Sequence, residues 1–579
     1  MNHFIPNLIH LGLNNLKHDP NYVQDDDEEE EMPDSQDSDI EDDGFEEEEY
    51  SDDDDVSWKV RRAAAKLLWA VILSYPSVLP EIYRDVAPVL ISRFNEREES
   101  VRVEILTTFR ELVRVTGQQG GEVVLSKDVP VGAGKRRRES SQSGERPIVP
   151  KALGSQLSGL VPRMCKTLTK QLAGNSVPTK LAGIALAREV MEVLNGGLGD
   201  VLPSFIRPVE SAMEGHGTSK SGVGPSGAAN ESNLKIETLK FIKAVFMTHT
   251  PATIGTQSAS HLAKVVNDAI AGERFYKVVA EGLDAVVPII SCLTALKEQN
   301  GLNAIAETIR TKVTAPDLDQ EVREKSIVAL GAALKTLGPD AGFTLLFDRL
   351  KLESVRLVTV KVIADVVEHS QIPDGPWAEE MTRELSTYLR RNNRDVKAAS
   401  LKALHAILAK YSASLSQERI DDLTDNLCSI LASDDGQLYA STLEVFTLAL
   451  QHHAPTWATS NQADSNVKIL ASLFFKQVPT QGSGWVPYGN FMVAACKSPL
   501  GLLISEAAKE YKPLESCDGN ELAVMAKVSA IAIVYSDATE QLQDALKLPE
   551  SGVKEHIQIL KLMTIGESGR LMYAIFILG

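Results

Sequence analysis

The apolar residues of this chain recur within single helices and again from one helix pair to the next. One face of a helix near residue 400 carries apolar residues at i, i+3, i+7 and i+11, namely Val396, Ala399, Ala403 and Ile407. A second apolar helix is predicted over residues 421–433. No alternating apolar and polar run is long enough for a sheet, so the pattern predicts an all-α protein.

A longer pattern contains a small or acidic residue, then a β-branched residue or Leu beside Lys or Arg, then an Ala-rich apolar run. The β-branched residue or Leu of each copy is called its anchor, and the anchors are Val60, Val101, Val177, Leu234, Val278, Val322, Val355, Val396 and Leu438. Six of the eight spacings between them lie between 33 and 44 residues. This spacing is close to the roughly 40–47 residues of a HEAT or armadillo unit. It predicts one HEAT/armadillo-type α-solenoid over residues 1–579, a right-handed superhelix of about 11–13 antiparallel helix pairs. An irregular helical protein is the alternative.

Three segments of biased composition interrupt this repeat. Residues 25–55, the acidic tract, contain 21 Asp and Glu and no Lys or Arg. Residues 117–150 and 214–231 are rich in Gly and Ser. All three are predicted to be disordered loops, because their apolar content is too low to offset the entropy of ordering. Helical segments flank the acidic tract, which is therefore predicted to be a lengthened turn within the first repeat.

The net charge of −20 comes from the acidic tract alone, because the rest of the chain has 58 acidic and 59 basic residues. The amino end has no basic leader, and the longest uncharged apolar stretch, residues 285–296, is too short to span a bilayer. We therefore expect a soluble intracellular protein, cytoplasmic and nuclear. The cysteines are single and odd in number, as expected of buried thiols in a reducing compartment: Cys165, Cys292, Cys428, Cys496 and Cys517.

No sequence motif for catalysis, nucleotide binding or metal binding is present. The Gly-rich residues 217–227 lack the G-K-[ST] ending of a phosphate-binding loop, and His452 and His453 lack acidic or Cys partners at ligand spacing. We therefore predict a protein that is not an enzyme, with no catalytic residues, no cofactor and no metal.

Three features are candidates for regulation or partner binding. A basic run is a candidate nuclear import signal and consists of Lys135, Arg136, Arg137 and Arg138. A cluster of solvated charges without this role is the alternative, with equal weight. Ser38 and Ser51 each precede an acidic residue by three and are candidate phosphorylation sites. A Lys or Arg row beside the anchors is a candidate partner-binding surface: Arg61, Arg102, Lys235, Lys277, Arg323, Arg356 and Lys397. Internal pairing between repeats is the favoured alternative for this row.

The acidic tract is followed by SWKVRRAAAK and then by LISRFNEREE. With SNLKIETL, RFYKV, DLDQEVREKSI, RLKLESVRLVTVKVI and YLRRNNRDVKAASLKAL further along, this order resembles the cullin-associated and neddylation-dissociated family over residues 4–570. The resemblance implies a HEAT-repeat, non-enzymatic clamp around a cullin bound to its RING subunit. Such a clamp covers the lysine that receives the ubiquitin-like modifier and displaces the substrate adaptor, so it regulates the assembly of cullin–RING ubiquitin ligases.

The chain departs from this family pattern at both ends. It begins at the acidic-tract repeat, and its apolar tail, residues 571–579, does not match. We therefore expect a truncated clamp without the adaptor-displacing hairpin, for which a separately encoded complementary piece is a candidate partner. No small-molecule, nucleic-acid or membrane partner is expected. The alternatives are an importin-β-like nuclear transport receptor and an acidic-loop chaperone for basic proteins such as histones.

Overall fold

The computed structural model describes residues 4–18, 57–120, 151–214, 225–433, 435–459, 463–473, 485–496 and a few single residues up to 507. Every regular element in these ranges is a helix, which confirms the predicted all-α fold. Contacts divide the chain into two units, residues 1–308 (unit 1) and residues 309–579 (unit 2). Helix α13 (Gln299–Thr314) spans the division.

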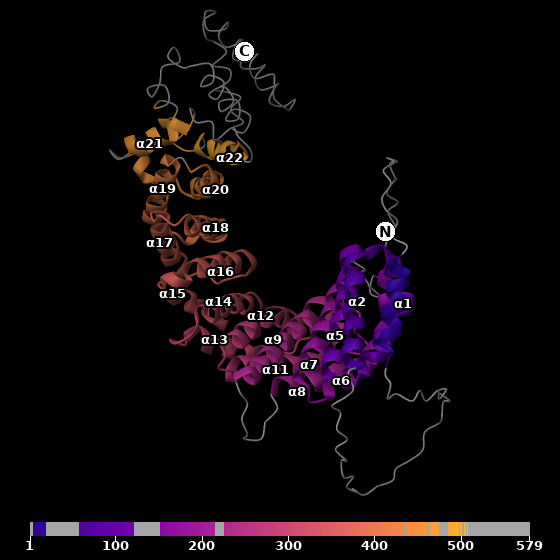
Figure 1. The fold of residues 1–579 in the computed structure, drawn as a ribbon. Coiled ribbons are helices and arrows are strands. Elements are labelled where there is room, and N and C mark those ends of the chain that lie inside the picture. The colour runs from indigo at the N-terminus through magenta and orange to yellow at the C-terminus, as the bar shows by residue number, and fades with distance from the viewer. Residues whose placement is uncertain are drawn as a thin grey trace, which may run out of the picture. The chain divides into compact units, whose positions relative to one another are not determined.

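In unit 1 the helices form two layers (Figure 1). Each helix of one layer packs on the next: α2 (Ser57–Ser74), α5 (Glu99–Gly120), α7 (Val177–Leu194), α9 (Pro225–Thr248) and α12 (Tyr276–Ala295). The other layer is built in the same way from α4 (Ala87–Ser92), α6 (Lys151–Ala173), α8 (Pro203–Glu214) and α11 (Thr256–Gly272). Helix α1 (Ile5–Leu16) packs on α2, and α3 (Leu79–Glu81) and α10 (Pro251–Ile254) are single turns.

Unit 2 repeats this arrangement. One layer contains α14 (Gln320–Leu337), α16 (Arg356–His369), α18 (Arg394–Tyr411), α20 (Gly436–His452) and α22 (Trp485–Cys496). The other contains α17 (Trp377–Leu389), α19 (Gln417–Ala432) and α21 (Ala463–Ser472), while α15 (Phe343–Leu350) packs on α16. Because each pair buries its apolar face on its neighbours, the predicted HEAT/armadillo-type solenoid is confirmed.

In three repeats the polar residue just before the sequence pattern is the N-cap of a helix. The side chain of Asp319 accepts a hydrogen bond from the backbone N–H of Glu321 at 2.9 Å, at the start of α14. Asn393 accepts one from Val396 at 3.1 Å, at the start of α18. Asp435 caps α20 in the same way. Each cap satisfies a backbone donor that the helix itself leaves unpaired, so the pattern marks where these helices begin.

The anchors mark buried positions in seven of nine cases: Val101, Leu234, Val278, Val322, Val355, Val396 and Leu438. Val177 is half-buried. Val60 differs from the other anchors, because its side chain is 37% exposed. Its neighbour Arg61 is buried instead, and α2 meets the core through Ala64, Ala65 and Leu68. A buried carboxylate, described below, allows the arginine to take this place.

Two helices extend into the segments predicted to be loops. Helix α5 continues to Gly120, and α9 already begins at Pro225. A Cβ atom on Gly117 would lie 2.8 Å from Cγ2 of Val193, so this glycine is a close helix contact between α5 and α7 and not a turn residue. The rest of the predicted loops and the apolar tail lie outside the described residues. So do Ser38, Ser51 and the basic run at residues 135–138.

Helix α12 is long and apolar enough to cross a membrane by length and composition. It packs between α9 and α11, and most of its apolar window is buried there, as in the core helix of a repeat stack. The thiols of Cys165, Cys292 and Cys428 are free and buried, as predicted. Burial raises the pKa of Cys165 to about 12 and that of Cys292 to about 11, so both thiols stay protonated and unreactive near neutral pH.

His249 links the end of α9 to the turn that follows α7. The backbone of this turn is left-handed at Asn195, Gly196 and Gly197, and the N–H of Leu198 then donates to Nε2 of His249 at 3.2 Å. Because Nε2 accepts this bond, the buried imidazole must be neutral. Burial also lowers its pKa.

We expect unit 1 to lose stability as His249 becomes protonated. A lowered pKa means that folding favours the neutral form, so the stabilisation is complete above the unfolded value of about 6.5 and is lost as the pH falls below it. The stability of unit 1, measured by hydrogen exchange, should fall more between about pH 7.5 and pH 5.5 in the wild type than in His249→Gln. His10→Gln removes an exposed histidine and should keep the wild-type dependence. Identical pH dependence in all three proteins would contradict this role.

Candidate interaction surface

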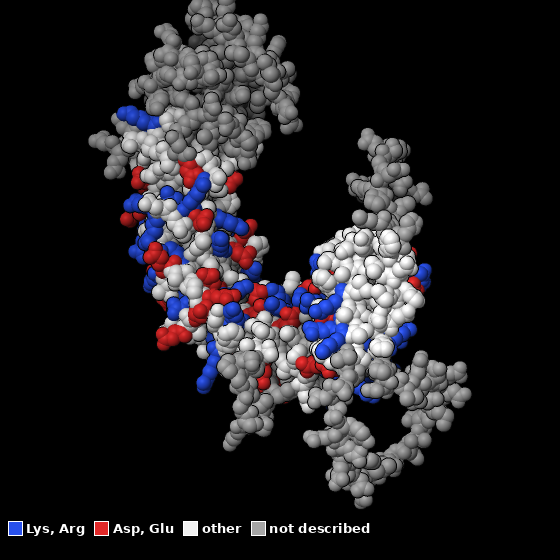
Figure 2. Space-filling view, viewed as in Figure 1, with Lys and Arg blue, Asp and Glu red and all other residues white. Residues whose placement is uncertain are grey.

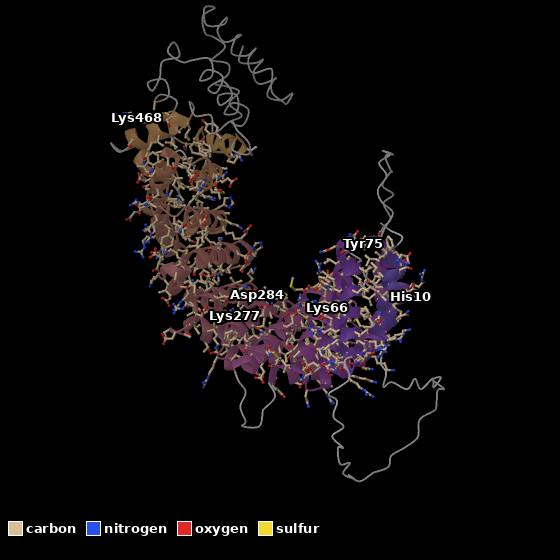
Figure 3. The ribbon with its side chains drawn as sticks, in the orientation of Figure 1. His10, Lys66, Tyr75, Lys277, Asp284 and Lys468 are labelled. Atoms are coloured by element: carbon tan, nitrogen blue, oxygen red, sulfur yellow. The ribbon has the colours of Figure 1, made fainter. Side chains whose placement is uncertain are left out.

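The layer containing α2, α5, α7, α9 and α12 carries ion pairs between neighbouring helices. In three of these pairs a cation reaches an acidic residue on the next helix: Arg62 to Glu104 (3.4 Å), Arg188 to Glu237 (2.6 Å) and Lys243 to Asp284. Lys66 also reaches Glu104, at 3.8 Å, and Figure 3 labels Lys66 and Asp284. The sequence signal is a pair of opposite charges about one repeat apart, which the sequence analysis missed.

Unit 2 has the same kind of pairing. Lys335 of α14 bonds Asp365 of α16 at 2.6 Å, and Lys402 of α18 lies 3.8 Å from Glu368 of α16. Figure 2 shows basic and acidic side chains interspersed along this unit. Exposed pairs of this kind contribute little stability each. Their main effect is to give each stack of helices a mixed, largely self-neutralised surface.

Three arginines of the predicted row cap the turn before their own helix. In each case the guanidinium donates to a backbone carbonyl five or six residues upstream: Arg102 to Glu96 (2.6 Å), Arg323 to Leu318 (2.9 Å) and Arg356 to Leu350 (3.2 Å). These carbonyls lie at or near the end of the preceding helix or turn, where no intrahelical donor remains. The recurring cation therefore holds the two helices of a repeat together.

Arg61 occupies the corresponding place at the acidic tract. Its guanidinium bonds Glu96 at 3.2 Å, and the two side chains are only 5% and 2% exposed. The same group donates to the carbonyl of His18, just beyond the end of α1, at 3.3 Å. The end of α1 and the start of α2 are therefore joined across the intervening residues 19–56, as expected for the two helices of one repeat.

The other three members of the row differ. Lys235 pairs with Glu273, whereas Lys277 lies over the Tyr276 ring at 5.9 Å. Within the described residues, Lys277 and Lys397 are tied to no carboxylate or backbone carbonyl. The contacts of the other five members support the internal role that the sequence analysis favoured. Partner binding by the row stays a prediction, carried best by Lys277 and Lys397.

Two exposed features of unit 1 are suited to a protein partner. Helices α1 and α2 expose four large apolar side chains, called here the α1–α2 apolar residues: Phe4 (70%), Leu11 (51%), Val60 (37%) and Leu73 (40%). Figure 2 shows a broad uncharged area over these two helices. Uncharged surface that exposes large apolar side chains often marks a protein-binding site.

The second feature, the RFYK turn (Arg274–Lys277), precedes α12. Its rings, Phe275 and Tyr276, are exposed and meet edge to face, with centroids 5.4 Å apart. Arg274 and Lys277 flank the two rings and are also exposed. Aromatic and arginine side chains are enriched among the residues that dominate binding at interfaces, so this turn is a second candidate contact.

The described residues include no group of His, Cys, Asp and Glu side chains able to hold a metal ion. His452 ends α20 and His453 is its C-cap.

A family profile described as "CAND1-like, TPR repeats" matches residues 151–330. The chain is 27% identical over 541 residues to cullin-associated NEDD8-dissociated protein 1 of Arabidopsis thaliana, covering 89% of this chain and 41% of that protein. It is 32% identical over 505 residues to the "C-terminal part" of protein 1 of Emericella nidulans, covering 76% and 48%. Protein 2 of Mus musculus is 29% identical over 517 residues, covering 87% and 38%. This chain is related to the cullin-associated NEDD8-dissociated proteins.

The predicted resemblance is thereby confirmed. The chain spans less than half the length of each of these relatives. Among solved structures, Kap121p is 11% identical with a TM-score of 0.44, covering 99% of this chain and 57% of that one. Kap121p bound to RanGTP is 12% identical with a TM-score of 0.43, covering 85% and 46%.

Proposed function

We propose that this chain is a non-enzymatic scaffold that binds an unmodified cullin together with its RING subunit and so regulates the assembly of cullin–RING ubiquitin ligases. The observation that carries the proposal is the extent of the similarity. It follows the helix repeats over 76–89% of the chain, in relatives whose names refer to cullins and to the modifier NEDD8.

The described surface supports binding of a protein better than chemistry on a small molecule. Most of the Lys and Arg row makes contacts inside the repeats. In the layers that contain α7 and α14, cations are paired with acidic residues of neighbouring helices, so these layers offer no single-sign field for a nucleic acid. The α1–α2 apolar residues and the RFYK turn offer separate apolar and aromatic contacts instead. A solenoid distributes such contacts over many repeats, so a long partner such as a cullin fits its surface.

The decisive measurement is the affinity of this chain for a purified cullin–RING pair with and without the covalently attached modifier. A clamp that covers the acceptor lysine is excluded by a modifier on that lysine, so we expect modification to weaken binding by about 100-fold or more. The same modifier added free in solution is the control and should have no effect. Equal affinity for both forms would contradict the proposed clamp.

Ran and core histones serve as parallel baits in the same assay. Binding to Ran in its GTP form would instead favour a nuclear transport receptor. Binding to histones that is lost when the 21 acidic residues of the tract are replaced by Asn and Gln would favour a chaperone for basic proteins. No described contact favours either alternative.

A further inference from the structure

Helix α6 carries an exposed row of three cations. Arg163, Lys166 and Lys170 lie at i, i+3 and i+7, and all three are exposed. None of them forms an ion pair with another described residue, in contrast to the paired cations of the other layer. Residues 146–188 contain seven Lys and Arg and no Asp or Glu. We call these three side chains the α6 basic face.

The helices beside α6 do not neutralise this face. Helix α4 contains no charged residue. The turns on either side of it, Ile82–Val86 and Arg93–Asn95, carry Arg84, Asp85 and Arg93, and Asp85 is bonded to Arg84 at 2.8 Å. Helix α8 contributes Arg207 together with Glu210 and Glu214. Glu210 already contacts His261 of α11, at 3.1 Å. The α6 basic face is therefore a local excess of positive charge on unit 1, suited to a ligand with several closely spaced anionic groups.

The end of α1, after which the chain continues into the acidic tract, lies close to this helix. The carbonyl of Lys17, at the end of α1, accepts a hydrogen bond from Arg93 at 3.2 Å. Two residues further on, Asn95 accepts one from Gln171 of α6 at 2.9 Å, and Gln171 adjoins Lys170. The chain that leads into the tract is thus connected through a single short turn to the end of α6 that carries the cations.

The length and charge of the tract fit this face. An extended chain advances about 3.3 Å per residue, so residues 19–24 can lead the tract about 20 Å from its point of departure. The three cations span seven residues of helix, or about 10 Å. Residues 25–31, DDDEEEE, are seven consecutive acidic residues and span this distance easily. Because the tract is tethered at both ends, its effective concentration at the face is of order millimolar, so individually weak contacts suffice.

We propose that the α6 basic face binds acidic polypeptide, and that the chain's own acidic tract occupies it in cis as a competitor of acidic partners. Carboxylates of the tract pair with Arg163, Lys166 and Lys170. The contact depends on salt, because the Debye length is about 8 Å at physiological ionic strength and about 3 Å at 1 M. The inference stands independently of cullin binding.

The test uses the full chain and a Glu-specific protease that cleaves within residues 25–55. We expect the triple variant Arg163→Glu/Lys166→Glu/Lys170→Glu to be cleaved about three- to tenfold faster than the wild type at physiological salt, and equally fast at about 1 M salt. The milder variant with Gln at the same positions should show a smaller increase. It keeps the test valid if the first variant does not fold.

The matched control makes the same charge change on exposed residues of unit 2, Lys351→Glu/Arg383→Glu/Lys402→Glu, and should be cleaved at the wild-type rate. Zero-length carbodiimide cross-linking should join Lys166 or Lys170 to Asp or Glu of the tract within one molecule. Equal cleavage of wild type and α6 variants would overturn the proposal, as would cross-links found only between isotopically distinguishable molecules. Binding of oligouridylate that depends on the α6 cations, with no change in cleavage, would show a nucleic-acid surface instead.

Discussion

Replacing Arg61 with alanine is expected to destabilise unit 1 by about 3–5 kcal/mol. The substitution leaves the nearly inaccessible Glu96 carboxylate with Arg93, 3.8 Å away, as its remaining described cation. It also removes the donor to the carbonyl of His18, so the join between α1 and α2 is weakened. Urea unfolding, followed by fluorescence of Trp58 and Trp69, both in unit 1, measures the change.

The next residue provides a matched control. Arg62 is 42% exposed and bonds Glu104 at 3.4 Å, so Arg62→Ala should cost less than about 1 kcal/mol. The double variant Arg61→Met/Glu96→Met removes both charges and should recover much of the loss, because no uncompensated charge remains buried. If the Arg61→Ala and Arg62→Ala proteins unfold alike, the buried pair does not hold this junction.

Residue patterns alone predicted the repeat, the helices and most of their buried faces. The reason is local: N-cap residues such as Asp319 and Asn393 and the apolar spacing after them act within a few residues of chain. Family resemblance, again carried by short motifs, pointed to the relatives that the comparisons found.

Features set by contacts between repeats were not predictable in the same way. In the layer that contains α2, α5, α7, α9 and α12, each cation has several acidic residues about one repeat away in the sequence. Only the packing of the helices selects Glu237 as the partner of Arg188. Gly117 lies in a Gly-rich segment that was predicted to be a loop, yet it belongs to α5 and allows this helix to pack closely against Val193 of α7. In α2 a buried counter-charge, Glu96, allows Arg61 to lie in the interior, and the anchor Val60 is exposed.

In unit 2, Arg356→Ala is expected to lower the free energy of unfolding by about 2–4 kcal/mol. The guanidinium donates to the carbonyls of Leu350 and Lys351, and it lies 5.0 Å from the centre of the buried Tyr388 ring. The Tyr388 hydroxyl also donates to the Leu350 carbonyl, at 3.2 Å, so one site joins α15, α16 and α17. Hydrogen exchange of peptides from these helices should report the loss directly.

Arg391 is the matched control, because it lies over the same ring at 5.5 Å but is exposed. We expect Arg391→Ala to cost less than about 1 kcal/mol. Lys397→Ala should leave stability unchanged, since its amine is tied to no carboxylate or carbonyl among the described residues. If Arg356→Ala unfolds normally yet weakens cullin binding, the cation row faces the partner and the internal role is wrong. If Arg356→Ala loses stability while Lys397→Ala loses only affinity, the row divides between cations that hold the repeats together and cations that meet the partner.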